Sequence, residues 1–192
     1  MVGKQLANKG QPARYPDLNA AVKQGLGDLE TAKSRGFPYG FKDGEAFEEF
    51  GRVLKRGVAS EPVPPGGIEV PTNDAVIQGS AVYRPTPGDI DVALLVDQAQ
   101  FDKLIEQSFA RECAKVRGRG INPLQMTMSD AQFAAEKTLA NAVETGIIKR
   151  SKVVPRLSDV RDRLEAVAGT GVDLSIVKRG GQFDRGPYFR IP

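Results

Sequence analysis

The sequence predicts an α/β (α+β) fold in which a small mixed β-sheet is flanked by helices, with a helical part at the N-terminus. Three features predict it. Residues 75–78, 90–96 and 172–177 are short apolar runs of strand length and composition. The segments between them carry apolar residues at helical spacing. Strands separated by helices are typical of a sheet with helices packed on it.

The N-terminal part is expected to be helical. Residues 1–16 are polar and interrupted by Gly and Pro, so they predict a loose lead-in. A helix is expected over residues 17–34, and a second, capped by Asp43, ends near Gly57. Residues 60–73 hold four prolines and predict a loop. We therefore predict a helical N-terminal extension at 1–60 and a second domain at 61–192.

The second domain alternates strands and helices. After the strands at 75–78 and 90–96, Asp97 is expected to cap a helix that runs to about residue 116. Further helices fit residues 129–144, capped by Ser129, and residues 158–168. The third strand, 172–177, is followed by a tail rich in Gly and Arg. The spacing thus predicts three strands in one sheet.

The composition excludes much of the catalytic repertoire. The 192 residues include no histidine, no tryptophan and one cysteine, Cys113. This composition excludes Ser-His-Asp and Cys-His triads and metal sites with imidazole ligands. It also excludes Cys₄ metal sites and an intramolecular disulfide. Carboxylates, hydroxyls, Lys, Arg, Tyr and hard metal ions remain. No run approaches a membrane span and residues 1–10 lack a signal-peptide core, so we expect no membrane partner and a cytoplasmic site of action.

The positive charge is concentrated near the C-terminus. Residues 149–192 hold 10 Lys and Arg against 5 Asp and Glu, a balance of +5, and residues 1–148 hold 17 against 19, a balance of −2. A basic tail is able to hold a triphosphate or RNA, although a solvated basic surface is an equal alternative. The candidate contacts, with Tyr188 and Phe189 as stacking surfaces, are Lys149, Arg150, Lys152, Lys178, Arg179, Arg185 and Arg190.

Two aspartates open the second predicted strand. Asp89 and Asp91 alternate with Ile90 and Val92, so the two acids project from one face while the apolar residues point to the core. Like charges this close repel and raise each other's pKa. A divalent cation relieves that repulsion, and carboxylate oxygens suit Mg²⁺. The pair predicts half of a metal site for phosphate chemistry, and the alternative is a polar turn before an exposed strand start.

Two further features fit the same chemistry. Gly79-Ser80 ends the first predicted strand, where glycine permits close backbone approach and the Ser80 hydroxyl donates to phosphate oxygens. Asp173 lies inside the third apolar run, on the face of Ser175 and Val177, where an acid is costly unless paired or liganded. Three aspartates around two metal ions would clamp the attacking and leaving oxygens of a phosphoryl transfer. The alternative for Asp173 is an edge-strand acid or a surface ion pair with a tail arginine.

This pattern resembles the nucleotidyltransferase superfamily typified by DNA polymerase β. The motif consists of a hydrophobic residue before Gly79-Ser80, a spacer, Asp89-Ile90-Asp91-Val92 and a later strand aspartate. The resemblance is closest to the minimal, single-domain members and covers residues 75–96, with Asp173 matched more loosely. It implies a catalytic domain at 61–192 in which Asp89 and Asp91 bind metal and Asp173 completes the site. Gly79 and Ser80 would bind the triphosphate. Separately from the resemblance, Arg84 lies in the connecting loop within reach of a phosphate or the acceptor, and a solvated loop arginine is an equal alternative.

The resemblance implies transfer of a nucleoside monophosphate from a nucleoside triphosphate (NTP) to an acceptor, with two Mg²⁺ ions and release of pyrophosphate. RNA, in particular tRNA, is the first expectation for the acceptor, because the C-terminal part is basic. A protein or small-molecule hydroxyl is the alternative. A polar lead-in before a compact domain with a basic tail also resembles the C-terminal module of secreted bacterial polymorphic toxins, which would imply an immunity protein as partner. The other class of function is non-enzymatic: a degenerate nucleotidyltransferase fold that acts as an antitoxin or as an RNA-binding module.

Overall fold

The structure is a computed structural model that describes residues 15–60, 70–107, 130–149, 157–184 and 186–192. A helix also spans residues 98–107, up to the last described residue before a gap. The labelled helices are α2 (Tyr15–Arg35), α3 (Gly44–Ala59), α4 (Ser80–Tyr83), α6 (Asp130–Thr145) and α8 (Leu157–Ala168). The strands are β1 (Ala75–Gln78), β2 (Ile90–Val96), β3 (Ile147–Lys149), β4 (Val172–Lys178) and β5 (Phe189–Arg190).

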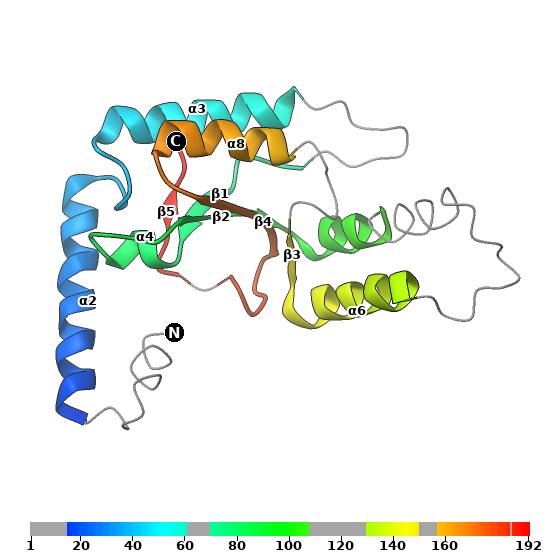
Figure 1. Cartoon of the computed structure of the whole chain (residues 1–192), viewed down its shortest axis with the longest axis horizontal. Helices are drawn as coiled ribbons and strands as arrows, with labels where there is room; N and C mark the ends of the chain where they lie inside the picture. The colour runs from blue at the N-terminus through cyan, green and yellow to red at the C-terminus, as the bar shows by residue number, and fades with distance from the viewer. Residues whose placement is uncertain (1–14, 61–69, 108–129, 150–156, 185) are drawn as a thin grey trace, which may run out of the picture.

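Within the described residues the strands form one five-stranded mixed sheet in the order β3-β4-β2-β1-β5 (Figure 1). β2 and β4 run parallel at its centre, and the other neighbouring pairs are antiparallel. β1 and β2 form a hairpin whose connection contains α4. The parallel pair needs a long crossover, which contains α6, β3 and α8.

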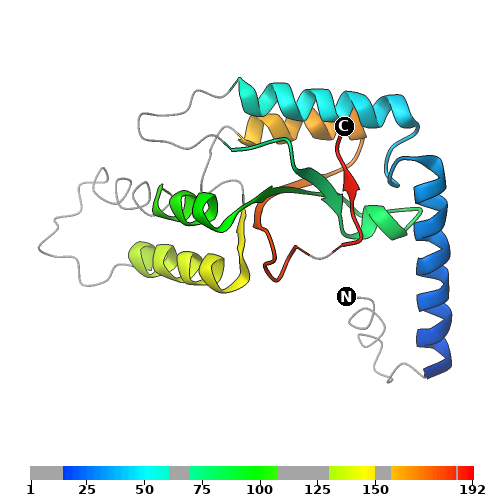
Figure 2. The same cartoon turned by 180° about the vertical axis from the view of Figure 1, so that it is seen from behind.

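One face of the sheet carries the main hydrophobic core. Alternate residues of β2 and β4 point into it, and α3 and α8 lie side by side above it (Figures 1 and 2). The helices are close, because a β-carbon at Gly57 would come within 2.9 Å of the Val160 methyl groups. The largest fully buried side chains of this core are Phe50, Phe101, Leu54, Ile77, Ile90, Leu94, Leu104, Leu157, Leu164, Leu174 and Ile176.

The opposite face holds a smaller apolar cluster of Val76, Ala93, Leu95 and Val177, all buried. Asp91 and Asp173 belong to this face by strand alternation, two residues before Ala93 and Ser175. The same face is therefore apolar in the middle of the sheet and acidic at the end where β2 and β4 begin.

The predicted elements are largely confirmed. β1 and β2 have the predicted bounds, and the mixed sheet flanked by helices is present. Asp43 accepts a hydrogen bond from the Ala46 amide at 2.8 Å, and Asp97 accepts one from the Gln100 amide at 2.7 Å, so both predicted caps form. The predicted helix C-terminal to residue 107, the Ser129 cap and most of the proline-rich loop lie outside the described residues.

Two strands of the sheet were not predicted. β3 lies between the helix predicted at residues 129–144 and the basic run that begins at Lys149, and β5 lies in the tail. Both are very short and pair through partners distant in sequence: β3 with β4, and β5 with β1. β3 occupies the outer position and pairs with residues 175–177 of β4, so β4 is an interior strand along that stretch. The alternative interpretation of Asp173 as an edge-strand acid stays open, since Asp173 lies beyond the residues that β3 pairs with.

Helix α3 shares the main core with the sheet. Its buried residues Phe47, Phe50 and Leu54 belong to one cluster with residues of β2 and β4. The last residue of the chain also reaches this helix, since a β-carbon at Gly51 would come within 2.7 Å of the Pro192 carbonyl oxygen. The division at residue 60 stays a prediction, and α3 packs as an integral layer on the sheet.

The tail returns to the sheet through one carboxylate. Asp74, just before β1, pairs with Arg179 after β4 and with Arg190 in β5, the latter at 3.0 Å. Hydrogen bonds from these two arginines hold the pKa of Asp74 below its ordinary value. The tail backbone is also fixed by hydrogen bonds from Arg179 N to Val96 O and from Ile191 N to Ala75 O, both 2.9 Å. Asp74 thus joins both ends of the segment between β4 and β5.

We expect Asp74→Asn to lower the melting temperature at neutral pH, because the amide cannot form the two ion pairs. The folded-state pKa of Asp74 lies below 3.8, so its stabilisation is present above that value and is lost as pH falls through the lowered pKa. Melting curves from pH 7 to pH 2 should show the wild type and the variant converge only in the acid range. Glu48→Gln, at an exposed position of α3, is the control. A difference that persists at pH 2 would contradict this account.

Candidate functional site

The residues singled out in the sequence gather at one end of the sheet. β1 ends at Gln78, and its antiparallel partner β2 begins at Ile90. β4 runs parallel to β2, so its first residues lie at this end too. The Gly79-Ser80 turn, the start of β2 and the start of β4 are therefore neighbours, with α4 leading away toward α2 (Figure 1).

Asp91 and Asp173 are direct partners in the parallel pair β2–β4. Paired residues on neighbouring strands point to the same face with their β-carbons about 5 Å apart. Both acids are partly buried. The residues on either side of each acid, Ile90 and Val92 in β2 and Val172 and Leu174 in β4, are buried in the main core. The expected alternation holds in both strands, and the register brings the two carboxylates together.

Gly79 presses against one of these acids. It has a φ of +72°, in the region that favours glycine, and a β-carbon there would overlap the Asp91 carboxylate. The turn therefore needs glycine for its conformation and for the close approach of Asp91. Ser80 follows at once as the first residue of α4, which is a single turn closed by the Arg84 amide on the Ser80 carbonyl at 2.9 Å. A single helical turn thus follows Gly79 directly.

Asp89 lies one step before β2, and its side chain is exposed. It stands next to Gly171, where a β-carbon would be 3.9 Å from the Asp89 β-carbon. Within the described ranges, no group of three Asp, Glu, His or Cys side chains comes close enough to hold a metal ion. The structure thus pairs Asp91 with Asp173 and leaves Asp89 at the rim.

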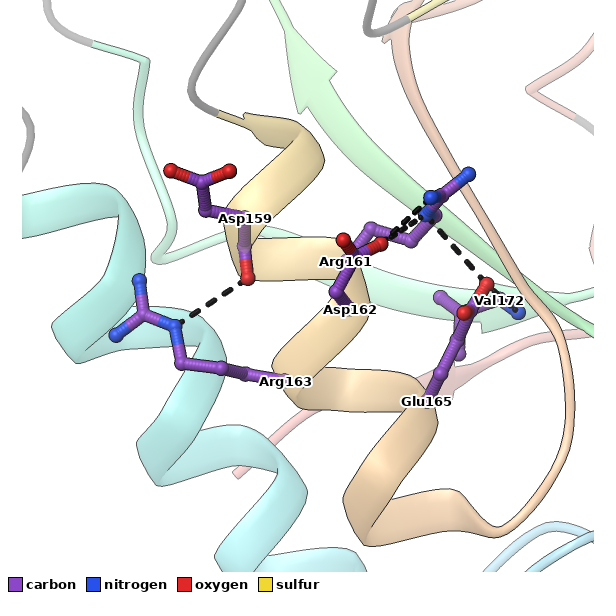
Figure 3. Close-up of polar contacts among 6 residues, drawn as sticks. All are labelled: Asp159, Arg161, Asp162, Arg163, Glu165 and Val172. Carbon is purple, nitrogen blue, oxygen red and sulfur yellow. Dashed lines mark hydrogen bonds and ion pairs between the residues drawn. The ribbon is translucent and has the colours of Figure 1, made fainter.

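Helix α8 fixes the start of β4 (Figure 3). Glu165 accepts a hydrogen bond from the Val172 amide at 3.2 Å, directly before Asp173. Arg161 lies 3.5 Å from the same carboxylate and also pairs with Asp162, which raises the pKa of Arg161. Gly169 ends the helix with φ +70°. The position of Asp173 therefore depends on a polar clamp between α8 and β4.

Gln78 is a residue of this site that the sequence did not single out. It pairs with Asp91 across the β1–β2 hairpin, so the two side chains share a face. Its amide oxygen Oε1 is buried and has no hydrogen-bond partner in the described part of the chain. A polar residue at the end of an otherwise apolar strand, one position before Gly79, was the signal in the sequence.

The basic candidates have different surroundings. Arg179 and Arg190 pair with Asp74, which precedes β1 at the end of the sheet opposite the candidate site. Arg84 stacks near Tyr83, with its guanidinium carbon 5.9 Å from the ring centre. Tyr188 is exposed, whereas Phe189 packs partly against the main core. Arg150, Lys152 and Arg185 lie outside the described residues, as does Cys113.

The donor set fits a hard cation. Asp91 and Asp173 present carboxylate oxygens from adjacent strands on one face, and Gln78 adds an amide oxygen in the same row. Mg²⁺ takes oxygen ligands of these kinds. Of the helices that the structure describes, none has both the length and the apolar character that a membrane crossing requires.

Comparison of the chain with protein-family models, with curated proteins and with solved structures gives no match. The function must therefore be inferred from the residues and geometry of the site itself.

Gly79→Ala should destabilise the fold by about 1–3 kcal/mol, because alanine is strained at positive φ and its β-carbon would displace the Asp91 carboxylate. Gly88→Ala is the matched control in the same hairpin connection, since no atom lies within 4 Å of a β-carbon there. Urea unfolding of the two variants measures the difference. Equal loss of stability in both would show that the turn tolerates a β-carbon at Gly79.

Glu165→Ala should cost about 1 kcal/mol, because the Val172 amide loses its acceptor. Glu165→Gln keeps an oxygen acceptor at the same place and should retain most of the stability. Thermal unfolding compares the three proteins, and amide hydrogen exchange at Val172 reports the bond itself. Unchanged exchange at Val172 in Glu165→Ala would contradict the clamp.

Proposed function

We propose that this protein is a Mg²⁺-dependent nucleotidyltransferase, which moves a nucleoside monophosphate from an NTP, ATP among them, to an acceptor. The observation that supports the proposal most directly is the pairing of Asp91 with Asp173 beside the Gly79-Ser80 turn. Two carboxylates and the Gly79-Ser80 turn meet at one end of a mixed sheet. The resemblance to the DNA polymerase β-like superfamily implies these residues together with Asp89 as a third acid.

Each residue would have a defined part. Asp91 and Asp173 would hold the cation, with Asp89 as a further ligand at the rim. The Ser80 hydroxyl and the open backbone of Gly79 would bind the triphosphate, and Arg84 would contact its outer phosphates. Bound Mg²⁺ would neutralise the charge that develops on the phosphates. Asp173 would favour loss of the acceptor proton, so that the acceptor oxygen bonds to the α-phosphorus and the bond to the leaving pyrophosphate breaks.

RNA, tRNA in particular, remains our first candidate for the acceptor, on the basis of the positive balance of residues 149–192. The pairing of Arg179 and Arg190 with Asp74 reduces that charge where it lies near the sheet. The charge argument for an RNA acceptor is therefore weaker than the composition alone indicates, and a protein or small-molecule hydroxyl is the alternative acceptor. Action in the cytoplasm, delivery as a secreted toxin and pairing with an immunity protein all belong to this proposal.

A second candidate function is a non-enzymatic one, in which the fold binds RNA or a protein partner as an antitoxin. The position of Asp89 favours it, since the described acids do not form a group of three metal ligands. The two candidates differ in what Asp91 and Asp173 do: the enzyme needs both carboxylates, whereas a binding module does not.

Incubation of the purified protein with α-³²P-labelled NTPs, Mg²⁺ and total cell extract tests the enzyme. We expect label on RNA, and loss of at least 100-fold in labelling with Asp91→Asn or Asp173→Asn, because each removes a charged oxygen from the site. Asp102→Asn, on the exposed face of helix 98–107, is the control and should label like the wild type. Absence of label with all four NTPs would contradict the proposed enzymatic function and favour the non-enzymatic binding module. Label on protein would correct the acceptor.

A further inference from the structure

Gln78 carries an unsatisfied polar atom inside the proposed site. Its Oε1 atom is buried, although the residue as a whole is only partly so, and it accepts no hydrogen bond from the described residues. Buried polar atoms in folded proteins are nearly always paired, so each exception needs an explanation. A buried amide oxygen without a hydrogen bond lowers the stability of the fold. Binding of a hydrogen-bond donor or a cation to that oxygen would remove this cost.

The position of Gln78 suggests what it is reserved for. Gln78 pairs with Asp91 in the β1–β2 hairpin, and Asp91 pairs with Asp173 in β2–β4. Three oxygen-bearing residues therefore form a row across three adjacent strands, with Asp91 in the middle and the β-carbons of neighbours about 5 Å apart. Gly79 directly follows Gln78 and lies against the Asp91 carboxylate. Because glycine has no side chain, nothing from this position blocks the carboxylate.

We propose that Gln78 is the neutral oxygen ligand of the divalent cation held by Asp91 and Asp173. This inference rests on the proposed function and adds to it a ligand outside the aspartate pattern. Mg²⁺ and Mn²⁺ accept amide carbonyl oxygens together with carboxylates. A neutral ligand would complete the coordination without adding a third negative charge beside the two carboxylates.

Binding of Mn²⁺, followed by electron paramagnetic resonance with and without a non-hydrolysable NTP analogue, tests this without any turnover. Gln78→Leu should weaken Mn²⁺ binding about 10-fold, because removal of one coordinating or orienting partner has effects of that size. Gln78→Glu keeps an oxygen at the same place and should bind Mn²⁺ at least as tightly as the wild type. Gln182→Leu, an exposed glutamine in the tail, is the matched control and should not change binding.

Thermal unfolding separates a ligand from a packing residue. Gln78→Leu removes an unpaired buried oxygen, so its melting temperature without metal should equal or exceed that of the wild type. If Gln78→Leu binds Mn²⁺ as the wild type does while Asp91→Asn does not, this inference fails and the proposed function stands. If the wild type binds no Mn²⁺ in either condition, the metal site fails and the proposed function fails with it.

Discussion

The parallel pairing of β2 with β4 is the constraint on which the rest of the structure depends. It sets Ile90, Val92 and Leu94 beside Val172, Leu174 and Ile176, and these two apolar rows form the centre of the main core. A slip of one residue in either strand would move its apolar row to the other face and turn its aspartate into the core. The position of the acids is therefore a consequence of hydrophobic burial: the register that fills the core is the one that pairs Asp91 with Asp173.

The elements around this pair hold the register from both sides. Helix α8 packs on the core face through Val160 and Leu164, and its Glu165 fixes the first amide of β4. Helix α3 lies beside α8, so the N-terminal helix contributes to the layer that keeps β4 in place. On the other side of β2, β1 is held by β5 and by the ion pairs of Asp74 with both ends of the tail. The segments that frame the site come from nearly the whole length of the chain.

Sequence reasoning succeeds where local chemistry determines the outcome. β1 and β2 are uninterrupted apolar runs between turn residues, and the Asp43 and Asp97 caps involve neighbouring amides. It fails for β3 and β5, because strands this short exist only through pairing with distant partners. The same limit applies at the site. Alternation predicts the face of each acid, but the register between β2 and β4, the unsatisfied Gln78 oxygen and the capture of two tail arginines by Asp74 all arise from tertiary structure.

Gln78, Asp91 and Asp173 place polar side chains at one end of a sheet face that is apolar in its middle. Two carboxylates at paired strand positions disfavour each other's charge unless groups of opposite charge or a cation lie nearby. Apolar residues at these positions would remove this effect and extend the cluster formed by Ala93, Leu95 and Val177. Burial of this sheet face therefore does not by itself require acids at these positions. In the proposed function, a bound cation would interact favourably with both carboxylates, and the proposal gives them that role.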